Sequence, residues 1–312
     1  MFSVIIPYYK KRKYIERCLD AVLNQTFKDY EIIVIDDGSN DDIAELLAQN
    51  YSGKVTLIQQ QNQGVSAARN AGIAAATHDY IAFLDADDYW SPLYLEKMAE
   101  VIHQEQNIKI IGSHYSRIKG KIETENKKLD YFLIKEYFKN ALRNMYFFTS
   151  ATVISKRFFE SEAGFNPILK SGEDIDVWFR AVASGGNAYY IRNTLVYYSD
   201  EDENQLTVAP KNYQNRFFAN IETLYFNENK VDNKDFYEFL SKFIYSSLYH
   251  FKYEKDTEKE SNHIKNIITN KFFFAELYYL IPFRIGNYLL KNNTFKKLTR
   301  RYFKFIFRYL HT

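Results

Sequence analysis

The sequence predicts an α/β fold with a doubly wound, Rossmann-like, mostly parallel sheet, followed by a helical C-terminal region. Short apolar runs alternate with stretches of helical periodicity over roughly residues 1–110, which is typical of a parallel sheet covered by helices. Acidic turns follow two of these runs, at the sheet edge where such folds bind ligands. From about residue 210 the pattern is mostly helical and rich in Phe, Tyr, Lys and Asn.

The elements of the first part follow from periodicity. Residues 3–7 form a short apolar strand, and Tyr14, Cys18 and Val22 then recur at helical spacing. Ser91 and Pro92 are expected to be the N-cap and first residue of a helix that ends at residue 103. The other predicted strands are residues 30–35, 55–59 and 81–84, and the other predicted helices are residues 41–50 and 65–76.

Beyond residue 110 the pattern is less regular. A charged, aromatic stretch at 123–145 separates two predicted strands, and the acidic run at 200–203 indicates a boundary loop. We therefore expect one domain at 1–205 and a helical region at 206–312. The elements predicted between 110 and 200 are strands at 109–115 and 149–155, a helix at 175–184 and an extended segment at 188–198.

Composition narrows the class of protein. With 46% hydrophobic residues, a chain of 312 residues can build a substantial core. Cys18 is the one cysteine, so no internal disulfide can form, and a packed thiol fits a reducing cytoplasm. The chain enters a strand at once, so we expect no signal peptide. No window offers the roughly 20 apolar residues of a membrane-spanning helix.

Asp85, Asp87 and Asp88 follow the predicted strand at 81–84. Three carboxylates at one strand end repel one another unless a cation lies among them, and hard divalent cations take oxygen ligands of this kind. Such a metal would in turn suggest a phosphorylated ligand. A solvated acidic turn that starts the next helix is the alternative, and a motif of this length alone does not exclude it.

Two further turns suit a nucleotide or another anion. Asp37 and Gly38 end the strand at 30–35, where an aspartate can accept hydrogen bonds from a base or ribose and glycine permits close approach. Arg69 lies in the helix that follows Asn62-Gln63-Gly64, and a helix N-terminus with a nearby arginine suits an anionic ligand. An ordinary turn with a capping aspartate, and a surface arginine, are the alternatives.

A last acidic turn comes at Glu173 and Asp174, which precede Trp178 in a predicted helix. A carboxylate that takes a proton from a sugar hydroxyl must lie across from the metal-bound donor, and Asp174 could do this if two halves close over one cleft. Both acids would also stabilise a helix N-terminus through its dipole, so this turn is ambiguous by itself.

The motifs together resemble family 2 glycosyltransferases of the GT-A fold, of the bacterial surface polysaccharide or lipid-linked glycan type. The resemblance covers roughly residues 1–200 and implies a nucleotide-sugar half at 1–110 and an acceptor half at 111–205. In chain order it rests on Val4-Ile5-Ile6-Pro7-Tyr8-Tyr9, Ile35-Asp36-Asp37-Gly38-Ser39, Asn62-Gln63-Gly64, Ala67-Ala68-Arg69-Asn70-Ala71-Gly72, Leu84-Asp85-Ala86-Asp87-Asp88 and Gly172-Glu173-Asp174.

The resemblance implies an inverting transferase, hexosyl or N-acetylhexosaminyl, that moves one sugar from a UDP-sugar. The acceptor would be a lipid-linked or surface glycan of the lipopolysaccharide, capsule or O-antigen type. The family pattern implies that Mn²⁺ or Mg²⁺ is the cofactor, with Asp87 and Asp85 as its ligands. The other donor-site residues it implies are Pro7, Tyr8, Asp37, Gly38 and Arg69, with Asp37 at the base and Asp85 near the ribose and sugar.

On the acceptor side the resemblance implies that Asp174 is the general base. Glu173 and Trp178 would support it or contact the acceptor. The chain departs from the family after its first strand, where Tyr9 and Lys10 replace a common Asn. It departs again at residues 199–202, where relatives often carry a His or Arg. A Gln-x-x-Arg-Trp motif is missing, which argues against a processive synthase.

Two other functions remain open from the sequence. A catalytically silent GT-A module could bind nucleotide or glycan within an assembly complex, although intact Asp85, Asp87 and Asp174 disfavour it. A nucleotidyltransferase would need a glycine-rich basic loop after the first strand, and residues 8–13 have the charge but no glycine. No recognised nucleic-acid-binding motif is present, so we expect no nucleic-acid partner.

The C-terminal tail separates charge from apolar surface. Residues 289–312 carry seven Lys/Arg and no Asp or Glu, which leaves +2 − 7 = −5 for residues 1–288. On a helix, Lys and Arg lie opposite an apolar arc, which fits an anionic membrane surface. We therefore expect a cytoplasmic protein, peripheral at the inner face of the membrane; a helix packed on the protein body is the alternative. The arc comprises Phe295, Leu298, Tyr302, Phe305, Ile306 and Tyr309.

Overall fold

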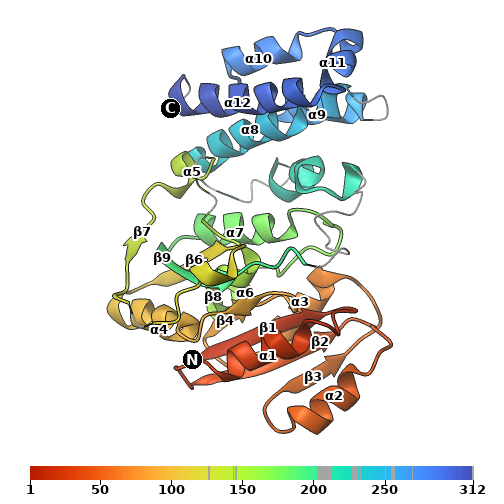
Figure 1. The fold of residues 1–312 in the computed structure, drawn as a ribbon. Coiled ribbons are helices and arrows are strands. Elements are labelled where there is room, and N and C mark those ends of the chain that lie inside the picture. Colours follow the sequence, from red (N-terminus) through yellow and green to blue (C-terminus); the bar gives the residue numbers. More distant parts are fainter. Residues whose placement is uncertain are drawn as a thin grey trace. The chain divides into compact units, whose positions relative to one another are not determined.

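The computed structural model shows two compact units, which are described separately (Figure 1). The first comprises Met1–Lys135 and Tyr146–Pro210, and the second Glu136–Met145 and Lys211–Thr312. The predicted boundary between 205 and 206 lies outside the described residues. The structure describes residues 1–125, 127–142, 144, 146–201, 213–226, 231, 233–249, 251–253, 257–268 and 270–310.

A nine-stranded sheet is the centre of the first unit, in the order β3-β2-β1-β4-β8-β6-β9-β5 with β7 paired to β9. β1 to β4 run parallel, and so do β6 and β9. β8 runs antiparallel to both of its neighbours, and β5 and β7 run antiparallel to β9. The strands are β1 (Phe2–Tyr8), β2 (Tyr30–Asp36), β3 (Thr56–Gln59), β4 (Tyr80–Phe83), β5 (Tyr89–Trp90), β6 (Ile108–Ser116), β7 (Tyr131–Leu133), β8 (Thr152–Ser155) and β9 (Asn187–Tyr197).

Helices cover both faces of this sheet, which confirms the predicted α/β class. Val4 and Ile6 of β1 share a core with Cys18 and Met98 from helices on one face. Ile5 points the other way and packs against α3, as alternation along a strand requires. The helices of this unit are α1 (Ile15–Leu23), α2 (Ile43–Asn50), α3 (Val65–Ala75), α4 (Tyr94–Gln104), α6 (Lys156–Ser161) and α7 (Glu173–Ala183).

The predicted start of α4 is wrong. The helix begins at Tyr94, with Leu93 as its N-cap. Ser91 lies before it, where its hydroxyl accepts from the Leu93 amide at 3.1 Å and donates to the Glu123 carbonyl. Trp90 and Ser91 pair with β9. Trp90 belongs to β5, which runs antiparallel to β9, and the Ser91 amide donates to the Leu195 carbonyl of β9. Pairing with β9 thus displaces the helix start predicted from the Ser-Pro pair.

The second unit is built from helices around α8. Residues 136–145, assigned to the acceptor half from sequence, belong to this unit instead because Phe138 of α5 packs against Phe236 of α8 at 5.1 Å. Its core is aromatic: Phe303 of α12 lies 5.6 Å from Tyr249 and 5.2 Å from Tyr278. The helices are α5 (Tyr137–Asn140), α8 (Lys234–Leu248), α9 (Glu258–Ile267), α10 (Phe273–Tyr279), α11 (Phe283–Leu290) and α12 (Asn293–Tyr309).

Helix α12 packs on its unit with a different face from the predicted apolar arc. Thr299, Phe303 and Phe307 are buried, and only Ile306 of the arc joins them. Leu298, Phe305 and Tyr309 of the arc are exposed, so they are not part of the core. No helix among the described residues is long and apolar enough to cross a membrane.

Gly72 sets the spacing between α3 and the sheet, and it gives a first test. A Cβ there would come within 2.5 Å of Ile5 and 2.8 Å of Ile35. Gly72→Ala is therefore expected to lower the free energy of unfolding by about 1–3 kcal/mol, because these buried neighbours must move. Chemical denaturation would measure this. Gly120→Ala, which adds a methyl group in open space, is the matched control and should unfold like the wild type.

Candidate active site

Asp85, Asp87 and Asp88 form a turn at the carboxyl end of β4, next to the carboxyl end of β1. The Asp88 amide donates to the Asp85 carbonyl at 2.9 Å. The Asp88 carboxyl is 1% exposed and accepts from the Ser150 hydroxyl at 2.5 Å and the Ser199 amide at 2.8 Å. Burial raises the pKa of Asp88 well above its usual range, with Asp85 and Asp87 adding to the shift. Asp88 therefore anchors the turn from inside, leaving the other two for a ligand.

Asp87 carries an ion pair that the sequence analysis did not predict. The Lys11 ammonium lies 2.7 Å from Asp87 Oδ2, and both side chains are mostly buried. Burial raises the pKa of Asp87, Lys11 opposes the shift, and the charge of Asp85 adds to it. Lys11 lies in the loop after β1, and Asp87 lies in the turn after β4. This pair could have been predicted only from the adjacent positions of β1 and β4 in the sheet.

Asp85 and Asp87 were expected to hold a divalent cation. No group of three or more metal-ligating side chains gathers anywhere in the part of the chain that is described. Two carboxylates with open coordination positions suit Mg²⁺ or Mn²⁺ when the ligand's phosphates complete the shell. Asp85 fits because its side chain is 30% exposed, and Asp87 fits if Lys11 moves away from it.

Arg69 of α3 is buried between two carboxylates. One terminal nitrogen lies 2.8 Å from Asp85 Oδ1 and the other 3.2 Å from Glu173 Oε1. Burial disfavours the charged guanidinium, but Asp85 and Glu173 outweigh it and raise the pKa of Arg69. The ring of Phe165 lies 5.2 Å from the guanidinium carbon. Arg69 thus connects the aspartate turn to the start of α7.

Asp174 lies in the first turn of α7, beside Glu173. Its Oδ2 accepts from the Thr149 hydroxyl at 3.0 Å, and its Oδ1 accepts from the Ile175 amide at 2.8 Å. Burial and the charge of Glu173 raise the pKa of Asp174 to about 6, although Arg69 opposes the shift. A carboxyl with this pKa is ionised at neutral pH and still basic enough to take a proton.

Thr149 and Ser150 are consecutive residues that hold the two acidic turns together. Thr149 binds Asp174, while Ser150 binds Asp88 and also accepts from the Asp85 amide at 3.1 Å. They lie in a short 3₁₀ segment before β8, which the sequence analysis assigned to a strand. Their part in the site depends on β8 lying next to β4, which periodicity does not reveal.

The predicted donor residues at the ends of β1 and β2 hold a neighbouring loop. Asp37 accepts from the amides of Gln63 and Gly64 at 2.9 and 2.8 Å. Gly38 has φ +74° and lies so close to Asn62 that a Cβ would be 2.8 Å from its amide nitrogen. Tyr8, which follows Pro7, donates to Asp41 at 2.6 Å. Asp37 therefore fixes the loop that leads into α3 and Arg69.

Trp178 does not lie at the surface of the site. It is 2% exposed and packs against Phe83 of β4 and Phe165 at ring distances of 5.9 and 6.1 Å. Trp178 shares its face of α7 with Asp174, four residues earlier, but Phe83 and Phe165 cover its ring. Of the two roles expected for Trp178, the structure is compatible with support and not with contact to an acceptor.

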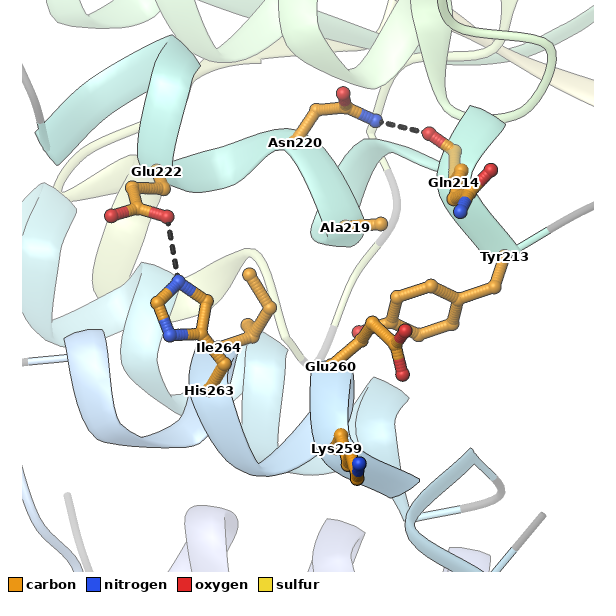
Figure 2. Close-up of a pocket in the computed structure, with 9 residues that line it drawn as sticks. All are labelled: Tyr213, Gln214, Ala219, Asn220, Glu222, Lys259, Glu260, His263 and Ile264. Carbon is orange, nitrogen blue, oxygen red and sulfur yellow. Dashed lines mark hydrogen bonds and ion pairs between the residues drawn. The ribbon is translucent and has the colours of Figure 1, made fainter. Parts of the chain in front are cut away.

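The second unit has a pocket of about 400 Å³ between its 3₁₀ and π-helical segments and α9 (Figure 2). Figure 2 shows the Glu222 carboxylate facing His263, whose ring nitrogen lies 2.8 Å away. Both side chains are well exposed to water, so the pair is weak. None of the residues predicted for catalysis or donor binding lines this pocket. Its lining residues are Tyr213, Gln214, Ala219, Asn220, Glu222, Lys259, Glu260, His263 and Ile264.

The sequence pattern of glycosyl transferase family 2 matches residues 3–161. The chain belongs to this family. An uncharacterized glycosyltransferase of Nostoc is 42% identical over 125 residues, 39% of this chain and 38% of the relative. One from Haemophilus influenzae is 27% identical over 208 residues, 63% of this chain and 67% of the relative. The chain thus spans little more than a third of the Nostoc protein.

The crystal structure of residues 1–349 of Staphylococcus aureus TarS, in complex with UDP-GlcNAc, has a similar fold. The TM-score is 0.75 at 16% identity, and the match covers 93% of this chain and 91% of TarS 1–349. The GT-A fold expected from the motifs, with C-terminal helices, is confirmed by this likeness. At this identity the likeness concerns the fold alone.

The buried arginine gives the second prediction. Arg69→Met should leave Asp85 and Glu173 next to each other without a counter-charge. We expect a loss on the order of 2–4 kcal/mol in the free energy of unfolding at pH 7, below the full value for a buried pair because both carboxylates are partly exposed. Urea denaturation at pH 7 would measure the loss, and a variant as stable as the wild type would contradict it.

Proposed function

We propose that this protein is an inverting, metal-dependent glycosyltransferase that transfers one sugar from a UDP-sugar to a hydroxyl of a glycan. The observation that carries the proposal is the joining of two acidic turns into one site. Arg69 bonds to Asp85 and Glu173, and Thr149-Ser150 bonds to Asp174 and Asp88. A donor carboxylate and a candidate base thus belong to one connected cluster. Family membership supports this choice of reaction.

The donor side would be formed by the carboxyl ends of β1, β2 and β4. Pro7, Tyr8, Asp37 and Gly38 would form the nucleoside pocket, with Asp37 at the base, and Asp85 would approach the ribose and sugar. The TarS structure was determined with UDP-GlcNAc, which supports a UDP-sugar here. Arg69 is paired with the carboxylates of Asp85 and Glu173. Its proposed role is therefore to orient these two residues and not to bind the phosphates of the donor.

In the proposed chemical step, Asp174 is the base and UDP is the leaving group. The acceptor hydroxyl gives its proton to Asp174 as its oxygen forms a bond with the anomeric carbon of the donor. The bond from that carbon to the diphosphate oxygen breaks on the opposite face, and UDP leaves with the electron pair. Attack from the face opposite the leaving group inverts the configuration. Thr149 holds the Asp174 carboxyl, and burial, with the charge of Glu173 adding to it, keeps the pKa of Asp174 high enough for the proton transfer.

Asp87 and Asp85 would hold Mn²⁺ or Mg²⁺. When bound, the cation supplies Lewis-acid stabilisation of the charge that develops on the departing diphosphate. Asp88, which is anchored to Ser150 and Ser199, keeps the turn in place for this purpose.

The acceptor proposed from the family resemblance is a lipid-linked or surface glycan. An acceptor on a lipid would place the enzyme at the cytoplasmic face of the membrane, and the basic residues of 289–312 suit an anionic surface there. The residues at 111–205, except the stretch that belongs to the second unit, would contact the acceptor. Glu173 would support Asp174 from the same helix turn.

Substitution of the proposed base tests the reaction. Asp174→Asn is expected to slow transfer by about 100- to 10,000-fold while leaving UDP-sugar binding intact, because the amide cannot take the proton. The wild-type rate should rise with pH through an apparent pKa near 6 and then level off, since only the ionised carboxyl accepts a proton. Release of UDP with a glycan acceptor would measure both, and calorimetry would measure binding.

The matched control is Asp29→Asn, which removes an exposed carboxyl paired with the Met1 amino group just before β2, at the end of that strand opposite to Asp37, and should behave like the wild type. Full activity of Asp174→Asn would contradict its role as base. UDP-sugar binding without turnover in the wild type, over a panel of acceptors, would instead favour the silent GT-A module.

The metal proposal has its own test. Removal of divalent cations with a chelator is expected to abolish transfer, and Mn²⁺ should restore it. Asp87→Asn should raise the Mn²⁺ concentration needed for half-maximal activity by about tenfold or more, because one of two charged ligands is lost. Undiminished transfer in the presence of chelator would exclude a required divalent cation.

A further inference from the structure

Exposed large hydrophobic side chains concentrate in the last three helices of the second unit. Among the described residues, those outside this region are scattered: Tyr9, Ile118, Leu133 and Ile168 lie on separate segments. Exposed apolar side chains that gather in one region mark an interaction site. Its members in the three helices are Phe273, Phe274, Leu277, Leu280, Ile285, Tyr288, Leu298, Phe305, Tyr309 and Leu310.

The apolar arc of α12 borders α10. Tyr302 lies on the same arc as Leu298 and Tyr309, and its hydroxyl donates to the Phe274 carbonyl of α10. The buried side of α12 is occupied by Phe303, which packs on Tyr278 of α10. α12 and α10 therefore lie side by side, as Figure 1 shows, and the arc of α12 borders α10.

α10 and α11 add the most exposed members of this surface. Leu280, just after α10, is 72% exposed, and Tyr288 of α11 is 75% exposed. Phe273 and Leu277 lie one turn apart on α10, and Leu280 follows at the next turn, so all three share a face. We call the exposed hydrophobics of residues 273–310 the apolar surface of α10–α12.

The same segment of the chain carries a large excess of positive charge. After Glu276 no Asp or Glu occurs up to the end of the chain. Glu276 itself is engaged by Lys265 at 2.7 Å and by Tyr245. Every lysine and arginine from 283 to 310 is exposed: Arg284, Lys291, Lys296, Lys297, Arg300, Arg301, Lys304 and Arg308.

We propose that the apolar surface of α10–α12 docks on an anionic phospholipid bilayer, with its apolar side chains in the interface and its cations on the headgroups. This inference extends the membrane partner of the proposed function from the 289–312 tail to α10 and α11. A second copy of the chain is a poorer occupant, because a self-complementary contact would bring the same unbalanced cations together.

Vesicle sedimentation of the full chain, without nucleotide, tests the proposal. We expect binding to vesicles of equal phosphatidylcholine and phosphatidylglycerol, and little binding to phosphatidylcholine alone. Leu280→Asn with Tyr288→Asn, which leaves residues 289–312 intact, should weaken binding about tenfold or more. Arg300→Gln with Lys304→Gln should weaken it and reduce its salt dependence. Ile168→Asn, an exposed apolar site in the first unit, is the matched control and should bind like the wild type.

Unchanged binding by the Leu280 and Tyr288 variant would overturn the three-helix surface. Absence of vesicle binding would overturn the membrane as occupant, and a dimer dissociated by the same variant would assign the surface to a second copy. Circular dichroism would confirm that each variant folds. Donor binding and transfer to a soluble acceptor are measured without vesicles, so failure of docking is distinguishable from failure of the proposed reaction.

Discussion

The buried ion pairs of Arg69 are the constraint on which the candidate site depends. A guanidinium buried to 3% exposure is tolerable only because two carboxylates compensate its charge. Those carboxylates, Asp85 and Glu173, come from turns almost ninety residues apart in the sequence. The fold must therefore bring β4 and α7 to one place before the arginine can be buried. In this sense the charge balance of the site is also a condition for the packing of the first unit.

Hydroxyl groups also hold the two acidic turns of the site. Thr149 and Ser150 contact the two acidic turns from one short segment, and the amide of Ser199 is a second donor to the Asp88 carboxyl. Of the carboxyl groups that the proposed reaction needs, Asp174 is held by a neutral hydroxyl, whereas Asp85 and Asp87 are held by the cations of Arg69 and Lys11. Arg69 and Lys11 offset part of the negative charge of the acidic turns. The pKa of Asp174 is still raised, because burial and the charge of Glu173 outweigh Arg69.

The sequence predicted the regular part of the molecule well, because β1, β2 and β4 are buried apolar runs and α1 has an unambiguous apolar face. It also located the acidic turns, since they follow strand ends. It could not predict the antiparallel insertion of β8, so the roles of Thr149 and Ser150 were missed. Arg69 was expected at the donor site, but its place in a helix does not indicate that Asp85 and Glu173 face it. The predicted start of α4 was wrong because the Ser91 amide pairs with β9.

Both tryptophans of the chain, Trp90 and Trp178, lie buried in the first unit, whereas the aromatic core of the second unit is made of Tyr and Phe. Indole emission excited near the red edge of protein absorption therefore reports the unfolding of the sheet unit alone. Far-ultraviolet dichroism reports both units, with a large share from the helices. Denaturation curves from the two signals should coincide if the units unfold as one and separate if they do not. The molecule thus carries an intrinsic reporter for the cooperativity of its two parts.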